Sequence, residues 1–158
     1  MSPSWHSPPG ARSRAARASG PYPPGVPLSL TKDSIDLGIV TTRPEASIAF
    51  YRDVLGLIDS GEMEMPGGRM RRLQCGTTTI KIVWLDREPK AVAPPGGIRA
   101  ATGYRYWTIS ISNLADVVAE CEAAGRPVVV PVTELRPGVT IAIVEDPDGN
   151  WVELLDTR

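Results

Sequence analysis

Residues 146–154 read DPDGNWVEL, and this segment carries the strongest structural signal in the chain. Its first five residues have the composition of a tight turn, because proline presets the backbone and glycine, asparagine and aspartate tolerate the left-handed conformation. Apolar residues then alternate with others from Trp151 to Asp156, which is the period of a strand with one buried face. The segment therefore predicts a turn that leads into the last strand of a sheet.

The elements expected before this strand occur twice in the chain. A strand, a helix and three strands are predicted from Tyr104 to Asp156, and the same order is predicted from Ser34 to Trp84. The helix of the second copy has apolar residues at helical spacing, namely Leu114, Val117, Val118 and Cys121. A repeat of about fifty residues with this order predicts two modules related by a pseudo-two-fold axis.

The helix of the first copy has recognisable start and stop signals. Thr42 and Glu45 have the spacing of a capping box, with proline between them at a position that tolerates it. Gly56 follows Leu55 where a left-handed residue often ends a helix. We therefore predict a helix from Pro44 to Leu55.

Three segments in this order resemble one known family. They are FYRDVLGL at residues 50–57, AAG at residues 123–125 and DPDGNWVEL at residues 146–154. Together they resemble the vicinal oxygen chelate superfamily, which includes glyoxalases, bleomycin-resistance proteins and extradiol dioxygenases. The resemblance covers about residues 33–157 and implies an α+β fold with two βαβββ modules, whose curled mixed sheets surround a shared cleft. Such a scaffold hosts many reactions, so it does not fix the chemistry.

The resemblance also implies a domain organisation. Residues 33–158 form one domain, with module one at 33–85, a linker at 86–102 and module two at 103–158. The first thirty residues hold seven of the sixteen prolines, three arginines and no acid, so we expect residues 1–32 to be a disordered tail. A plain extension and a basic docking arm both fit this composition. The only histidine, His6, lies in that tail and is not expected in any site.

Composition excludes several classes of function. A chain of 158 residues with 42% hydrophobic residues suits one domain with a core. The formal net charge of −1 argues against a strongly basic nucleic-acid binder, and no apolar run is long enough to span a membrane. The N-terminus has no apolar stretch of the signal-peptide type, and two cysteines make no disulfide framework. We therefore expect a cytoplasmic protein with neither a nucleic-acid nor a membrane partner.

Strand alternation predicts where the functional side chains lie. Apolar residues such as Ile39, Ile82 and Leu154 share one strand face, which should pack on the helices. The other face of the first and last strands of each module is mostly polar, which suggests a lined cavity. It carries Asp36, Thr79 and Lys81 in module one, and Tyr106, Thr108, Ser110, Trp151 and Glu153 in module two.

The resemblance implies that four of these positions correspond to the family's divalent-metal ligands, which are usually histidines and glutamates. The positions are occupied by Asp36, Lys81, Tyr106 and Glu153, and only Glu153 keeps a usual ligand. Protonated Lys81 cannot ligate a metal, and its charge repels a cation. We therefore expect no cofactor, with a weak Mg²⁺ or Mn²⁺ site at Asp36 and Glu153 as the alternative.

Acid–base catalysis is the favoured interpretation of the same four residues. Two carboxylates placed unequally around a lysine can differ in pKa, so that one accepts a proton and the other donates one. Tyr106 and Lys81 can stabilise an oxyanion, while Thr79, Thr108 and Ser110 orient the substrate. This predicts a metal-independent isomerase, lyase or cyclase that acts on a carbonyl-containing organic molecule.

Other interpretations of this face remain open. Lys81 can simply neutralise the two acids in an abandoned metal site. Trp151 and the acids can hold a planar cationic drug, as in an antibiotic-sequestering protein, or Trp151 can pack at the sheet edge. A metal-dependent lyase or dioxygenase with degenerate ligands is the last alternative. The expected partner is a small organic molecule, and the expected assembly is a homodimer, since symmetric dimers are the commonest assemblies.

Overall fold

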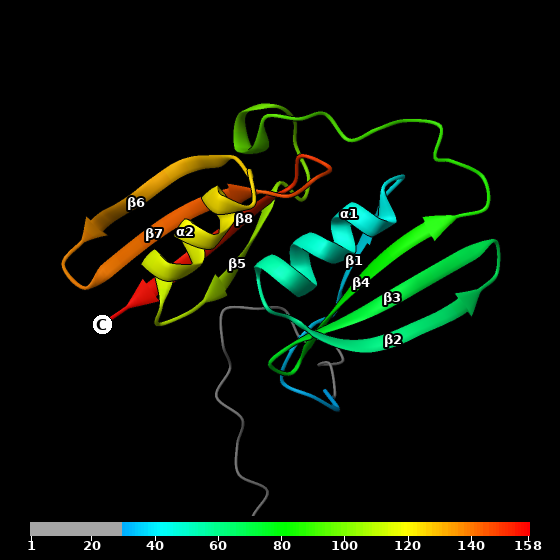
Figure 1. Cartoon of the computed structure of the whole chain (residues 1–158), viewed down its shortest axis with the longest axis horizontal. Helices are drawn as coiled ribbons and strands as arrows, with labels where there is room; N and C mark the ends of the chain where they lie inside the picture. The colour runs from blue at the N-terminus through cyan, green and yellow to red at the C-terminus, as the bar shows by residue number, and fades with distance from the viewer. Residues whose placement is uncertain (1–29) are drawn as a thin grey trace, which may run out of the picture. The chain divides into compact units, whose positions relative to one another are not determined.

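A computed structural model describes residues 30–158, and in it each module forms a four-stranded mixed sheet (Figure 1). The first sheet has the order β1-β4-β3-β2, with β1 at Leu37–Val40, β2 at Ile58–Met65, β3 at Gly68–Cys75 and β4 at Thr78–Leu85. The second has the order β5-β8-β7-β6, with β5 at Tyr106–Ser110, β6 at Val128–Arg136, β7 at Val139–Glu145 and β8 at Trp151–Thr157. In both, the first and last strands pair in parallel. The predicted pair of βαβββ modules is confirmed.

One helix belongs to each module, and each packs against its own sheet (Figure 1). In module one, α1 (Pro44–Ala49) continues as the π-helical turn η1 (Phe50–Val54), and in module two the helix is α2 (Leu114–Ala123). The predicted capping box is wrong, since Arg43 is the N-cap residue and no side chain caps the helix. The Arg43 N–H instead donates to Thr41 Oγ1 at 2.8 Å, so a threonine one residue earlier shapes the helix entry.

The core lies between the helices and the sheets and draws on both modules. The predicted apolar face is buried at Ile39, Ile82 and Leu154, and the α2 stripe is buried at Val118 and Cys121. The core cluster joins side chains of α1 and η1 to side chains of α2, β7 and β8. The modules therefore share one hydrophobic core within residues 32–158.

The first strand begins later than the predicted start at Ser34. Ile35 is 80% exposed, and Asp36 also precedes β1. Ser34 Oγ donates to the Thr77 carbonyl at 2.8 Å. This segment is thus tied to the turn between β3 and β4 through side chains rather than by a backbone ladder. The predicted tail of residues 1–32 and His6 fall outside the described residues, apart from residues 30–32.

Polar contacts also join the two modules. The Tyr51 hydroxyl donates to Asp146 Oδ2 at 2.7 Å, and Ser47 Oγ donates to Asp148 Oδ2 at 2.9 Å. Asp146 is 2% exposed and also accepts hydrogen bonds from the backbone N–H groups of Asp148 and Asn150. Burial raises the pKa of Tyr51 well above its ordinary value, and the charge of Asp146 adds to this effect. The turn at residues 146–150 therefore also fastens module one to module two.

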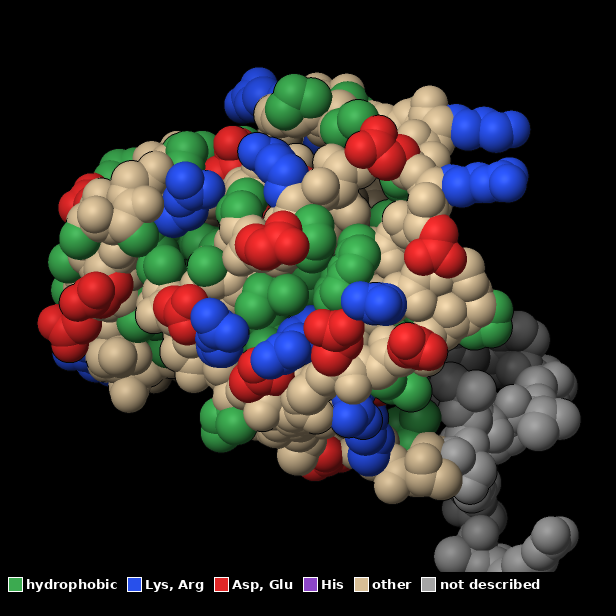
Figure 2. Space-filling view, turned by 45° about the vertical axis from the view of Figure 1, so that its right-hand side comes forward, with side chains coloured by type: hydrophobic (Ala, Val, Ile, Leu, Met, Phe, Trp, Pro, Cys, Tyr) green, Lys and Arg blue, Asp and Glu red, His purple; other side chains and the backbone are tan. Residues whose placement is uncertain are grey.

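Acidic and basic side chains are interspersed over the face of the molecule that Figure 2 shows, with apolar side chains between them. None of the helices in residues 30–158 has both the length and the apolar character needed to cross a bilayer.

Candidate functional site

We call the face of each sheet that turns away from its helix the open face. Strand residues paired in register project to the same side, so the ladders identify its members. In module one, Gly38, Lys81 and Arg72 are neighbours across three strands. In module two, Thr108 pairs with Glu153, and Tyr106 pairs with Trp151. Tyr106, Thr108 and Ser110 are exposed, while Trp107 and Ile109 pack against the core. The predicted alternation is thus present in the structure.

In module one, Asp36 is surrounded by hydrogen-bond donors and positive charge. Its Oδ2 lies 3.3 Å from Lys81 Nζ, while its Oδ1 accepts the Thr79 N–H at 3.0 Å and a hydrogen bond from Lys32. These contacts lower the pKa of Asp36 from 3.8 to about 2, with the Lys32 hydrogen bond as the largest cause, followed by Thr79. Asp36 is therefore a persistent anion and a weak base. This arrangement suits the holding of Lys81 better than proton transfer.

The pKa of Asp36 can be measured directly. We expect a carbon-detected NMR titration of its carboxyl group to give a midpoint near 2. Because this pKa lies below its ordinary value, the stabilising contribution is present at neutral pH and is lost as the pH falls from about 4 through the folded-state value. Lys32→Met should raise the pKa more than Lys81→Met does, since Lys32 is the larger cause. A midpoint near 4 in the unaltered protein would contradict this.

In module two, Glu153 has a different environment. Thr108 Oγ1 donates to its Oε2 at 2.6 Å, and in residues 30–158 it forms no ion pair with a lysine or arginine. The threonine fixes one carboxylate oxygen and leaves the other for a ligand. Tyr106 is 47% exposed and precedes Thr108 by two residues on the same face. Glu153, Thr108 and Tyr106 thus form a carboxylate and two hydroxyls on one open face.

The structure brings the predicted site residues together in two separate groups. Thr79 and Lys81 contact Asp36 in module one, and Thr108 contacts Glu153 in module two. No hydrogen bond or ion pair joins the two groups within the described part of the chain. Ser110 and Thr108 line a groove of about 500 Å³ that also contacts the start of β1 and β4. This groove is where the edges of the two sheets approach each other.

Trp151 is partly covered by the segment between the modules. Its indole N–H donates to Glu145 Oε2 at 3.2 Å, and its ring lies against Gly97 in the short helix η2 (Gly97–Arg99). A Cβ on Gly97 would clash with the ring, so only glycine fits this contact. The Arg105 guanidinium holds this segment by donating to the Gly97 carbonyl at 2.8 Å. These contacts favour the interpretation of Trp151 as a packing residue.

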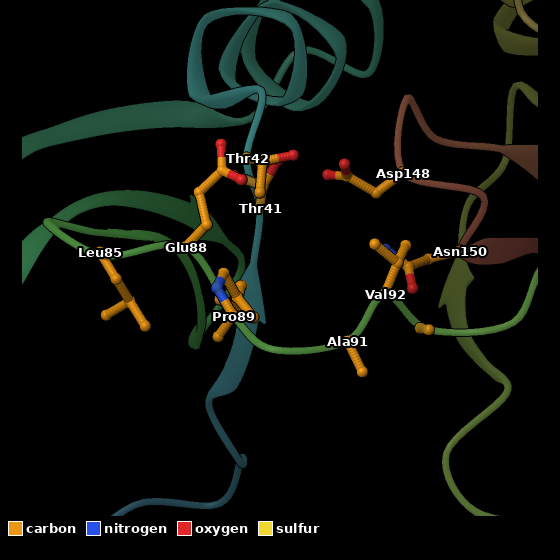
Figure 3. A pocket seen from close by; sticks show the side chains of 11 residues that line it. Thr41, Thr42, Leu85, Glu88, Pro89, Ala91, Val92, Asp148 and Asn150 are labelled. Carbon is orange, nitrogen blue, oxygen red and sulfur yellow. The ribbon is translucent and has the colours of Figure 1, made fainter.

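A second hollow was not anticipated from the sequence. It has a volume of about 490 Å³ and is lined by residues 88, 89 and 91–93 of the predicted linker, by Leu85, by residues 40–42, and by Asp148 and Asn150. Asp148 and Asn150 lie across it from Thr41, Thr42 and Glu88 (Figure 3). Residues 86–102 have no hydrophobic period, so no sequence pattern predicted how this segment would fold back. The turn composition around Asp148 was the one sequence feature that indicated any part of this hollow.

The donor set does not match the divalent metal that the sequence resemblance implies. Within residues 30–158, no three histidine, cysteine, aspartate or glutamate side chains gather in a way that could hold an ion. Both oxygens of Asp36 are engaged by lysines, and the ammonium of Lys81 lies at one of the four expected ligand positions. A divalent cation placed there would meet two positive charges. The residues present therefore do not fit a metal at these four positions.

Comparisons with known proteins support a family relationship. A family model described as the Glyoxalase/Bleomycin resistance protein/Dioxygenase superfamily matches residues 34–154. A lactoylglutathione lyase from Schizosaccharomyces pombe is 28% identical over 128 residues, which are 73% of this chain and 42% of that protein. The chain thus spans less than half the length of this relative.

Solved structures show the same fold. A glyoxalase family protein from Bacillus cereus superposes with a TM-score of 0.72 at 14% identity, covering 82% of this chain and 96% of that one. A glyoxylase/bleomycin resistance protein/dioxygenase domain from Frankia sp. EAN1pec gives a TM-score of 0.64 at 18% identity, covering 84% and 94%. At these identities the likeness extends to the fold alone.

Proposed function

The chain belongs to the glyoxalase/bleomycin resistance protein/dioxygenase superfamily, and from this premise we propose that it is an enzyme that moves protons on a small carbonyl-containing organic molecule. The observation that carries the proposal is the contact of 2.6 Å between Glu153 and Thr108 on the open face of module two. A carboxylate held by one oxygen and free at the other is arranged as a general base. The name of the fission yeast relative supports a reaction of the lyase type.

Each residue of this group has a proposed role. Glu153 takes the proton from the carbon next to the carbonyl, and the electron pair of that C–H bond moves onto the carbonyl oxygen. The hydroxyl of Tyr106 donates a hydrogen bond to the oxyanion that forms, and Thr108 orients Glu153. Protonated Glu153 then returns its proton to a different atom or face of the enolate as the carbonyl re-forms, which gives isomerisation. Where a substituent on the next carbon leaves with its bonding electron pair, the proton goes to that leaving group instead, which gives elimination. Ser110, further along β5, helps to position the substrate.

Asp36 and Lys81 have supporting roles in this proposal. The low pKa of Asp36 makes it a poor proton acceptor at neutral pH, so we take it as the residue that positions Lys81. Thr79 positions Asp36 in turn through its backbone N–H. Lys81 supplies positive charge on the open face of module one. The reaction proposed here needs no metal, because the side chains named above carry each proton and each charge.

Solvent exchange tests this proposal across a range of candidate substrates. The full chain, treated with a chelator, is incubated in D₂O with a panel of small ketones, aldehydes and 2-oxo acids, and proton NMR follows the signals of the α-hydrogens. We expect enzyme-dependent loss of these signals for at least one compound. Exchange that stops on chelation and returns with Mg²⁺ or Mn²⁺ would contradict metal independence. Saturable binding without exchange would favour a sequestering protein, and a panel with neither would overturn the assignment of a carbonyl substrate.

A further inference from the structure

Arg72, in the middle of β3, is a charged side chain that the proposed reaction does not use. It pairs in register with Lys81 and therefore projects to the open face of module one. Its Nη2 donates to the Ser60 carbonyl at 2.9 Å, while its buried Nε has no hydrogen-bond partner among the described residues. A buried donor without an acceptor is costly. This guanidinium is therefore incompletely satisfied by residues 30–158.

The neighbouring arginines of β3 provide a contrast. Arg71 projects to the helix side of the sheet and contacts Asp59 at 2.6 Å, and Arg69 lies 3.8 Å from Glu62. Within the part of the chain that the structure describes, Arg72 forms no ion pair with a carboxylate. Three arginines thus lie on one strand, and the one that faces the open side is the one without an acid beside it.

The charges around Arg72 do not cancel. On and beside the open face of module one, residues 30–158 provide three cations, Lys32, Arg72 and Lys81, against one carboxylate, Asp36. The open face of module two carries instead two acids, Glu145 and Glu153, and one base, Arg136. The two open faces therefore differ in sign. Excess positive charge beside apolar residues such as Met70 and Val83, which lie on the same face, suits an organic anion.

We propose that Arg72 anchors an anionic group of the ligand, a carboxylate or a phosphate, with Lys81 as the adjacent positive charge. A guanidinium presents a planar fork of N–H donors that matches both groups. In residues 30–158 the Nη1 group of this fork is neither buried nor hydrogen-bonded, so it is the donor that an anion oxygen reaches, while the buried Nε gains an acceptor only if the side chain moves. This inference rests on the proposed function for the reacting carbonyl, and together they define the substrate as an anionic carbonyl compound. Specificity then comes from module one and proton transfer from module two.

Two pairs of compounds that differ in charge test the anchor. Phenylpyruvate is compared with its methyl ester, and dihydroxyacetone phosphate with dihydroxyacetone, by titration calorimetry at low and high salt. We expect at least one anion to bind more tightly than its neutral partner, with an affinity that falls as salt rises. The phenylpyruvate pair reports a carboxylate anchor and the other pair a phosphate anchor. Equal binding within both pairs, or no binding of either anion, would overturn the inference.

Variants of β3 then assign the effect to one residue. Arg72→Met keeps most of the side-chain length and should weaken anion binding at least tenfold while leaving the neutral partner unchanged. Arg69→Met removes a guanidinium from the same strand but from the opposite face, and should leave anion binding as it is. Arg72→Lys keeps the positive charge and loses the fork of N–H donors, so its affinity for the anion should lie between those of the unaltered protein and Arg72→Met. This variant also tests the proposal if Arg72→Met folds poorly. Anion binding that survives in both Arg72 variants would contradict the proposal.

Failure of the anchor can be told apart from failure of the proposed reaction. Glu153→Gln should abolish exchange yet keep the preference for the anion, because Arg72 is untouched. If the unaltered protein prefers the anion but catalyses no exchange, the proposed reaction is contradicted and the proposed anchor still stands. If Arg72→Met exchanges the substrate at an unchanged rate and binds the anion with unchanged affinity, the proposed anchor is contradicted and the proposed reaction still stands.

Discussion

Replacing Glu153 by glutamine is expected to slow solvent exchange of the substrate by about 10²–10⁴-fold, the contribution typical of a general base. Glutamine has nearly the same shape as glutamate and can still accept the hydrogen bond from Thr108, which now measures 2.6 Å. It cannot accept a proton at neutral pH. The substrate should therefore still bind, and the loss should appear in kcat rather than in KM. Proton NMR exchange rates over a range of substrate concentrations separate the two.

Glu145→Gln is the matched control for this change. Glu145 is the other glutamate on the open face of module two, and it accepts the indole N–H of Trp151. If any negative charge on the open face of module two were sufficient for catalysis, Glu145→Gln and Glu153→Gln would lose activity to a similar degree. We expect Glu145→Gln to retain most of the rate. If Glu153→Gln kept the rate and Glu145→Gln lost it, the role of general base would be assigned to Glu145.

Thr108 explains why Glu153 rather than Asp36 is given the role of base. The strand pattern puts both acids on one face and leaves their division of labour open. The structure gives Asp36 three donors, Lys32, Lys81 and the backbone of Thr79, which hold its pKa near 2. Glu153 has one neutral donor and no ion pair in residues 30–158. Spacing along a strand shows which face a carboxylate is on, but its partners decide what it can do.

Much of the fold could be predicted because its signals are local and repeated. Alternation placed Ile82 and Leu154 in the core and Tyr106 on the open face, and the structure confirms these positions. The order of strand, helix and three strands appeared twice, so the second copy supported the interpretation of the first. Glycine after each helix marked its end at positions 56 and 125, where the backbone is left-handed.

The features that could not be predicted from the sequence depend on contacts between distant segments. Ser34 Oγ donates to the Thr77 carbonyl, and the backbone ladder of β1 begins only at Leu37. The hollow beside Asp148 exists because the segment after Leu85 folds back, and that segment has no period to interpret. Arg72 was also missed, because the polar face was predicted only for the first and last strands of each module, and β3 is neither. Whether a cation lacks an acidic neighbour can be learned only from the structure, because the neighbours lie on other strands.

Removing the carboxylate of Asp146 is expected to destabilise the domain by on the order of 3–5 kcal/mol. The reason is that Asp146→Ala leaves several donors without an acceptor at once: the Tyr51 hydroxyl in module one and the backbone N–H groups of Asp148 and Asn150 in module two. Each buried group left unpaired costs about 1–3 kcal/mol. Urea unfolding, followed by tryptophan fluorescence and far-ultraviolet circular dichroism, gives the free energy of unfolding.

Tyr51→Phe isolates the bond between the modules. It removes one donor from Asp146 and leaves the 0% exposed ring in place, so we expect a loss of about 1–3 kcal/mol. Tyr104→Phe makes the same chemical change at a fully exposed tyrosine and should shift stability by less than about 0.5 kcal/mol. Equal effects of the two tyrosine variants would show that the hydroxyl of Tyr51 does not join the modules. A larger effect at Tyr51, with one cooperative transition in both probes, would mean that the turn at residues 146–150 fixes module one and module two as one folding unit, and so fixes the open faces that carry Glu153 and Arg72.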